Sequence, residues 1–190
     1  MITPDKSMLA YADSTVLTYS YDQTNTVNYQ FNKSGFRNHH ECDFIPEYVF
    51  FGCSTVFGVG VASDKIFSSY FNNYFNFGLE TDDSKKFNLP GPYNNLDILS
   101  TIIDFNNNLL YTNQTKCAVL WTDRDNEDVD LIIKDCNSIS INLVHFKIGL
   151  HNSKLSQNLL PQVDSDASKT HGGIKSHKLW AYQIYKTLNQ

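Results

Sequence analysis

Residues 48–52, YVFFG, decide the fold class of this chain. The run is apolar up to the glycine that ends it, which is typical of a strand buried on both faces of a sheet. Ala118–Trp121 and Leu143–Ile148 repeat this largely apolar character. Such strands occur mainly in parallel sheets that helices cover on both faces. We therefore expect a doubly wound, mainly parallel α/β domain of the Rossmann-like kind over residues 46–190.

Segments with helical spacing of apolar residues lie between these runs. Ser63 and Asp64 offer an N-cap for a helix through Tyr74, and Asn94 or Asn95 for a helix through Leu109. The further elements that we expect are strands at 75–79 and 86–89, a helix opened by 126–128, a short helix within 154–168, and a short strand with a C-terminal helix within 174–188.

The first 45 residues have a different pattern. Val16–Tyr21 and Val27–Phe31 are short alternating runs around the polar segment 22–26, which predicts a β-hairpin. The polar stretch 32–43 then forms a connector. An isolated hairpin is marginal in water, so we expect residues 1–45 to pack on the α/β domain.

Composition excludes several classes of protein. The 190 residues include 41% hydrophobic residues and only 18% charged residues, with 13 Phe, 11 Tyr and a net charge of −5. That balance lacks the basic face that nucleic acids and anionic membranes require, and no apolar run is long enough to span a membrane. The length suits one domain with a sizeable core besides the N-terminal hairpin.

The features that bear on compartment point in different directions. Four cysteines form an even set, compatible with two disulfides or with reduced thiols. Asn32 and Asn113 each begin an N-glycosylation sequon. The N-terminus lacks the basic start and apolar run of a signal peptide, so the chain reads as cytoplasmic as written.

Ligands of such sheets bind at the carboxyl ends of the strands. A dinucleotide could use Gly58–Ser63 with Glu80, but the glycines begin seven residues after Phe51 and Ser63 replaces the third glycine. Cys53 follows a strand, yet no histidine partner can be assigned to it as a nucleophile, and a buried or bridged cysteine is the plainer interpretation.

Three further segments contain residue types that can bind metals or ligands, but their patterns favour loops over binding sites. His39-His40-Glu41-Cys42 has no metal-binding spacing. The acidic run Asp123–Asp130 lacks the glycine and the final glutamate of a calcium loop. His171-Gly172-Gly173 is more typical of a turn than of a site. We expect no cofactor.

The chain resembles the von Willebrand factor A-like family over residues 46–190. Ala118–Trp121 running into Thr122-Asp123 is similar to that family's fourth strand and its "TD" loop, and Leu143–Gly149 to the next strand, which ends in "IG". Val49–Ser54 and Ser69–Asn73 further resemble an uncharacterised group of secreted nematode proteins. The resemblance implies an A-like α/β fold and favours an extracellular location.

The resemblance also implies a site that is degenerate here. A-like domains bind a divalent cation through Asp-x-Ser-x-Ser, a threonine and the "TD" aspartate, but Gly52–Val56 holds no aspartate. Asp123 and Ser54 remain as remnants, so we expect no metal. The candidates for ligand binding are Ser54, Thr55, Asp123 and Arg124.

The A-like strand order further implies a cysteine pairing. Cys42, Cys117 and Cys136 would share the amino edge of the sheet, whereas Cys53 would lie at the carboxyl edge. This arrangement favours a Cys42–Cys117 disulfide, with Cys117–Cys136 as the alternative and Cys53 free.

The expected function is therefore a non-enzymatic interaction or adhesion module, a glycoprotein that binds a protein or glycan without metal. The alternative is a Rossmann-like nucleotide-binding enzyme that uses the loop at 58–63.

Overall fold

A computed structural model describes residues 17–20, 26–32, 36–37, 44–78, 95–108, 111–122, 134, 141–148, 158–167, 169 and 171–190. Five strands form one parallel sheet in the order β4-β3-β5-β6-β7. The strands are β3 (Tyr48–Gly52), β4 (Tyr74–Gly78), β5 (Lys116–Thr122), β6 (Leu143–Ile148) and β7 (Leu159–Leu160). Within this sheet the order is 2-1-3-4-5, one of the two common orders of doubly wound sheets.

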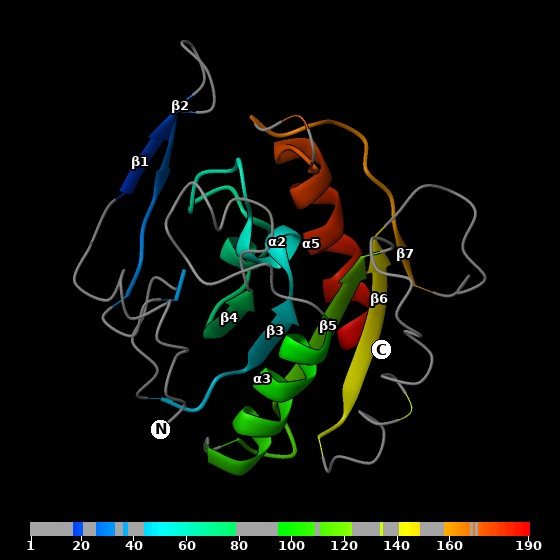
Figure 1. Cartoon of the computed structure of the whole chain (residues 1–190). Helices are drawn as coiled ribbons and strands as arrows, with labels where there is room; N and C mark the ends of the chain where they lie inside the picture. The colour runs from blue at the N-terminus through cyan, green and yellow to red at the C-terminus, as the bar shows by residue number, and fades with distance from the viewer. Residues whose placement is uncertain are drawn as a thin grey trace.

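Helices cover both faces of the sheet (Figure 1). Helix α3 (Asn95–Asn108) packs Ile98, Ile102 and Phe105 against one face. Helix α5 (Ile174–Leu188) packs Trp180, Ala181 and Ile184 against the other. Alternate residues of β3 and β5 belong to the two clusters, as the period of two in a strand requires. The expected α/β sheet with parallel strands and two covered faces is confirmed.

Two short helical turns complete the described helices. Helix α2 (Ser54–Phe57) follows β3 directly, and the 3-10 helix η1 (Phe67–Tyr70) precedes β4. The predicted helix from 63 to 74 is wrong, since only 67–70 is helical. The chain becomes extended at Phe71, adopts a positive φ at Asn73, and enters β4 at Tyr74.

Two other predicted elements differ near the C-terminus. The described part of 154–168 holds β7 and an irregular segment instead of a helix. The expected short strand within 174–188 is absent, because helix α5 occupies that whole range. The expected strand at 86–89 and the helix start at 126–128 lie outside the described residues.

An antiparallel strand pair lies beside the main sheet. Strands β1 (Leu17–Ser20) and β2 (Thr26–Tyr29) pair with Leu17 opposite Tyr29, and residues 21–25 between them lie outside the described set. The side chains of Val27, Tyr29 and Phe31 pack against Phe57 and Val59. This cluster joins the N-terminal segment to the loop that follows α2.

The cysteines that the structure describes are reduced. Cys53 and Cys117 are both buried free thiols. Cys117 therefore forms neither of the expected bridges; it lies in the core between α3 and the sheet, opposite Val49 and Leu143. Cys42 and Cys136 fall outside the described residues. In the described part of the chain, no helix is long and apolar enough to cross a membrane.

Candidate functional site

Ser54 lies at a strand-to-helix junction on the carboxyl edge of the sheet. β3 ends at Gly52, and Ser54 is the first residue of α2. A Cβ on Gly52 would come within 2.8 Å of the Leu120 carbonyl oxygen, so the sharp exit from the strand requires glycine. A serine held on a tight strand-to-helix turn is the setting of the nucleophile in many hydrolases.

His171 contacts Ser54 from a distant part of the chain. The His171 Nε2 atom lies 2.8 Å from the Ser54 Oγ atom, within hydrogen-bond distance, although 117 residues separate them. Both side chains are buried, with 6% of His171 and 3% of Ser54 exposed. His171 stands just before α5, so the packing of that helix on the sheet delivers the imidazole to the end of β3.

Asp166 lies against the other side of the His171 ring. Its Oδ2 atom is 3.5 Å from His171 Nδ1, and its Oδ1 atom accepts the backbone N–H of His171 at 3.2 Å. The Asp166 N–H donates in turn to the His171 carbonyl oxygen at 3.0 Å, and Gln162 Nε2 donates to the same oxygen at 3.1 Å. The backbone therefore fixes the carboxylate relative to the ring.

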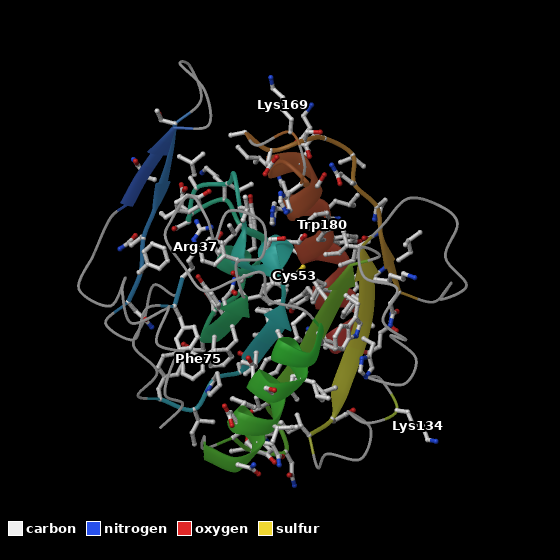
Figure 2. The ribbon with its side chains drawn as sticks, in the orientation of Figure 1. Arg37, Cys53, Phe75, Lys134, Lys169 and Trp180 are labelled. Atoms are coloured by element: carbon white, nitrogen blue, oxygen red, sulfur yellow. The ribbon has the colours of Figure 1, made fainter. Side chains whose placement is uncertain are left out.

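The order Ser54–His171–Asp166 reproduces the connectivity of a serine nucleophile, a histidine base and an orienting carboxylate. Cys53 lies next to this cluster, because the Ser54 hydroxyl also donates to the Cys53 Sγ atom at 3.9 Å. Figure 2 shows Cys53 where β3 gives way to α2, at the end of the strand.

Gly60 presses the loop after α2 against the Asp166 carboxylate. Gly60 has φ +72°, and a Cβ at this position would overlap the carboxylate group. Its carbonyl oxygen accepts the N–H of Ala167 at 3.3 Å, and its N–H donates to the Tyr29 hydroxyl at 2.8 Å. The carboxylate is thus held from both sides by backbone.

Arg37 fixes this loop from the N-terminal segment. Its Nη1 atom donates to the carbonyl oxygens of Phe57 and Gly58 at 2.6 and 2.7 Å. Its Nη2 atom donates to the Val61 carbonyl and the Ser63 hydroxyl, both at 2.9 Å. The guanidinium group is buried and lies over the Tyr29 ring, with its Cζ atom 4.5 Å from the ring centroid.

These contacts bear on the expected nucleotide site at Gly58–Ser63. A phosphate needs the backbone N–H groups of such a loop. Here the Gly60 N–H already donates to the Tyr29 hydroxyl, and Arg37 binds the carbonyl oxygens of Phe57 and Gly58. Gly58–Val61 are also buried, so this loop does not present its N–H groups to a phosphate. Glu80, the expected ribose ligand, lies outside the described residues.

Asp164 anchors the start of α5 close to His171. Its carboxylate accepts the N–H groups of Lys175 and Ser176 at 2.8 and 2.7 Å, as an N-cap residue would. Partial burial acts to raise the pKa of Asp164, but the Ser176 hydroxyl and these N–H groups outweigh it, and the pKa is lowered. The cap fixes the register of α5 against the loop that carries His171.

His177, one turn into α5, is a second buried imidazole and makes no contact with Ser54. Its Nδ1 atom accepts the N–H of Phe67 at 3.1 Å, and its Nε2 atom has no hydrogen-bond partner among the described residues. Burial, aided by the positive charge of Arg37, lowers the pKa of His177 to about 3. His177 is therefore neutral and belongs to the core.

The four expected ligand-binding residues fall into two groups. Ser54 belongs to the cluster with His171 and Asp166, and its neighbour Thr55 is buried in α2. Asp123 and Arg124 lie outside the described residues, as does the cluster at 39–42. Among the residues that the structure describes, no group of three His, Cys, Asp or Glu side chains could hold a metal ion.

The two sequon asparagines differ in their surroundings. Asn32 is 7% exposed, and its Oδ1 atom accepts the N–H of Phe36 at 2.9 Å. Asn113 is exposed in the turn before β5. A glycan needs an accessible amide nitrogen, so of the two positions only Asn113 offers one in this fold.

Sequence reasoning missed the contacts of His171 and Asp166 with Ser54 and with each other. Two local signals could have found them: a Gly-x-Ser directly after a buried strand, and an Asp-x4-His directly before the C-terminal amphipathic helix. Neither signal is specific alone. Their combination gains meaning only once the sheet places the end of β3 beside the start of α5.

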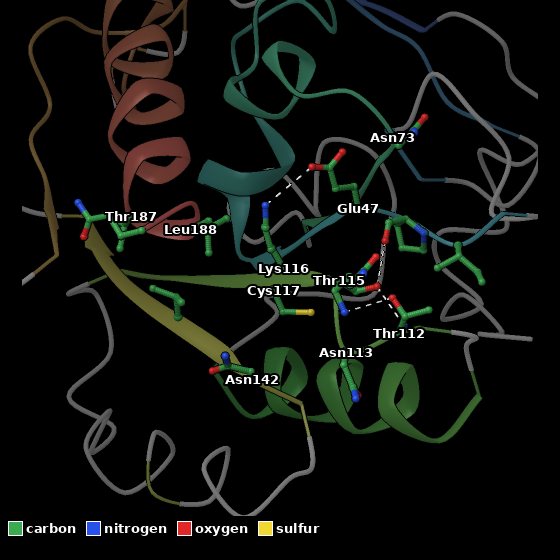
Figure 3. A pocket seen from close by; sticks show the side chains of 15 residues that line it. Glu47, Asn73, Thr112, Asn113, Thr115, Lys116, Cys117, Asn142, Thr187 and Leu188 are labelled. Atoms are coloured by element: carbon green, nitrogen blue, oxygen red, sulfur yellow. Dashed lines mark hydrogen bonds and ion pairs between the residues drawn. The ribbon is translucent and has the colours of Figure 1, made fainter.

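A polar cavity lies at the opposite, amino edge of the sheet (Figure 3). Its volume is about 820 Å³, and Asn, Thr and Gln side chains provide much of its lining. Lys116 approaches Glu47 at 3.9 Å and also donates to Asn189, and Thr115 donates to the Pro46 carbonyl at 3.0 Å. None of the described residues that line this cavity is a serine, histidine or aspartate.

Comparison with protein-family models, with curated proteins and with solved structures found no match to this chain.

Proposed function

We propose that the protein is a serine-dependent hydrolase that cleaves carboxylic esters through an acyl-enzyme. The observation that carries this proposal is the 2.8 Å approach of His171 Nε2 to Ser54 Oγ, with Asp166 on the other ring nitrogen. Nucleophile, base and orienting group are the three parts that acyl transfer requires.

Each residue has a defined role in this reaction. His171 carries its proton on Nδ1, toward Asp166, so that Nε2 can accept the proton of the Ser54 hydroxyl. The Ser54 oxygen attacks the ester carbonyl, and His171 passes the proton to the departing alcohol. A water molecule then attacks the acyl-serine; His171 takes its proton and returns one to Ser54 as the carboxylic acid leaves.

The start of α2 supplies the groups that stabilise the oxyanion. Val56 and Phe57 donate their N–H groups to the Cys53 carbonyl, whereas Ser54 and Thr55 are the first two residues of the helix. N–H groups at this position lack an intrahelical acceptor. We assign them as the oxyanion donors, in the arrangement that uses the backbone beside the nucleophile.

Hydrolysis of p-nitrophenyl acetate by the purified chain tests this proposal. We expect Ser54→Ala and His171→Gln to lower kcat/KM by at least a thousandfold, because each removes a member of the reacting set. Asp166→Asn should lower kcat/KM by a smaller factor and alter the pH profile, since it changes the tautomer of His171.

Ser69→Ala is the matched control. The hydroxyl of Ser69, which lies in η1, donates to the carbonyl oxygen of Ile66 at 2.8 Å. This variant should keep full activity. Hydrolysis that survives Ser54→Ala, or that Ser69→Ala lowers equally, would contradict the proposal.

The metal-free interaction module of the A-like kind stays the second candidate, with a protein or glycan as its ligand. It is supported by the parallel pairing of β3 with β5, the neighbours that the A-like order requires. A thermal-shift series with magnesium, manganese, calcium and adenine nucleotides separates the candidates. The module predicts no ester hydrolysis and no shift; a nucleotide shift would favour the Rossmann-like alternative.

A further inference from the structure

An apolar groove runs between η1 and the outer face of α5. Tyr70 and Phe71 line one side, and Leu179, Tyr182 and Tyr185 line the other. The cavity has a volume of about 600 Å³, within the range of roughly 300–1,000 Å³ that small-molecule sites occupy. The buried face of α5 packs on the sheet, so this groove lies on the side of the helix directed away from the core.

The rings around the groove are exposed although they are large. Tyr70 is 46% exposed, Tyr182 61% and Tyr185 53%, whereas Phe71 forms a buried floor at 6%. The Tyr185 ring lies 6.2 Å from that of Phe71 and 6.5 Å from that of Tyr48, measured between centroids. The groove is therefore partly preorganised by ring contacts beneath it.

The charge of the groove is opposite to that of the chain. Lys175 and Lys178 line one end, and with Lys186 they are the only charged residues of α5. The chain as a whole carries 20 acidic side chains against 15 Lys and Arg. Asp164 accepts the backbone N–H of Lys175 and interacts electrostatically with its ammonium group, but among the described residues neither Lys175 nor Lys178 forms a salt bridge within 4.0 Å.

We propose that this groove binds an amphiphile with an anionic head and a linear apolar tail, the head at Lys175 and Lys178 and the tail along the tyrosines. Charge complementarity selects the head, and the apolar floor selects the tail. A single tail that lies along the Phe71 floor and the tyrosine rings is the occupant that we propose, and a bilayer contact is the alternative that the vesicle experiment below tests. This site is independent of the proposed reaction at Ser54.

Titration of the full chain with laurate, below its micelle concentration and followed by calorimetry, tests the proposal. We expect one site, and an affinity that rises about threefold to fourfold for each methylene added from octanoate to laurate. Acetate and inorganic phosphate should not bind measurably. Dodecyltrimethylammonium, with the same tail and a positive head, should bind at least tenfold more weakly than laurate.

Charge reversal locates the site. Lys175→Glu together with Lys178→Glu should weaken laurate binding at least tenfold, and Tyr182→Ala should flatten the dependence on chain length. Lys134→Glu reverses an exposed charge far from α5 (Figure 2) and should leave binding unchanged. All of these positions are on the surface, so far-UV circular dichroism should show the same fold.

Three results would overturn the proposal. They are equal affinity for the cationic and anionic amphiphiles, no laurate binding below the micelle concentration, and binding only to phosphatidylglycerol vesicles. The last result would identify the surface as a membrane contact. The Ser54→Ala variant should bind laurate like the unmodified chain, so failure of the hydrolase proposal leaves this test intact.

Discussion

At the scale of single residues, His177 shows how burial sets the charge of a side chain. The imidazole is enclosed by Phe67 and Trp180, with ring centroids 6.1 and 4.8 Å away. Its Nδ1 atom accepts the Phe67 N–H, so the ring holds η1 on α5 only while Nδ1 is unprotonated. His171, which precedes His177 by less than two helical turns of chain, contacts Ser54 and Asp166 instead.

This difference predicts how stability depends on pH. The pKa of His177 is about 3 in the folded chain against an ordinary value of 6.5, so the unfolded chain binds the extra proton between these values. His177 therefore contributes stability that is complete above pH 6.5 and is lost as the pH falls toward 3, by up to about 1.4 kcal/mol per pH unit.

Urea unfolding of the chain and of His177→Asn across this pH range measures the contribution. The asparagine carbonyl can replace Nδ1 as the acceptor for Phe67 but does not titrate. We expect the free energy of unfolding of the variant to vary less with pH than that of the unmodified chain. Parallel curves for the two proteins would refute a titrating role for His177.

Cys117 gives a second prediction at this scale. Burial raises the pKa of its thiol to about 12, and the side chain is 1% exposed. The thiolate is the reactive form, so Cys117 should resist iodoacetamide at pH 8 in the folded chain and react in 6 M guanidinium. Peptide mapping by mass spectrometry checks this; rapid native labelling of Cys117, or a disulfide from it, would contradict the structure.

At the scale of elements, the loop after α2 depends on one buried cation. Arg37 donates four hydrogen bonds to residues 57–63, and this loop carries Gly60 to the Asp166 carboxylate. Arg37→Met should lower the free energy of unfolding by roughly 3 kcal/mol, because it leaves buried carbonyl oxygens without donors.

Arg37→Met should lower the rate of ester hydrolysis by more than the decrease in folded protein explains, because the loop that contacts the Asp166 carboxylate is no longer held in place. Lys65→Met is the matched control: Lys65 pairs with Asp64 on the surface at 3.0 Å, so its removal should leave the free energy of unfolding almost unchanged. Chemical denaturation measures the stability of both variants, and ester hydrolysis is then compared at equal concentrations of folded protein. Equal stability of the two variants would contradict a stabilising role for the hydrogen bonds that Arg37 donates to residues 57–63.

The elements also show which parts of the fold can be predicted from sequence. The apolar runs at 48–52 and 118–121 predict strands correctly, because a strand buried on both faces admits few polar residues. The run at 143–148 is also a strand, although only Phe146 and Ile148 are buried in it. The aromatic segment 66–74 misled the prediction, since its spacing fits a helix while Asn73 takes a positive φ that ends any such helix. Short strand β7 has only two residues and leaves no periodicity to detect.

At the scale of the whole molecule, the candidate site depends on topology. In the sequence, Ser54 is a candidate because it follows a buried strand and matches a remnant of the A-like site, but His171, which contacts it, lies 117 residues away. No local pattern specifies that separation. The contact exists because α5 returns across the sheet and its capped start lies at the carboxyl edge, beside the end of β3.

The fold also places the three candidate sites of the molecule apart from one another. The Ser54 cluster lies at the carboxyl edge of the sheet, the polar cavity lies at the amino edge, and the tyrosine groove lies along the outer face of α5. We therefore expect substitutions in the groove to change amphiphile binding without changing the intrinsic reactivity of Ser54.

Covalent labelling with a fluorophosphonate tests the central claim most directly, because this probe reacts far faster with a serine that a neighbouring base activates than with an ordinary hydroxyl. The structure predicts a single adduct by intact-protein mass spectrometry, located on Ser54 by peptide mapping and lost in both Ser54→Ala and His171→Gln. Absence of an adduct on the folded chain, or an adduct that persists in His171→Gln, would contradict the assignment of Ser54 and His171 as nucleophile and base.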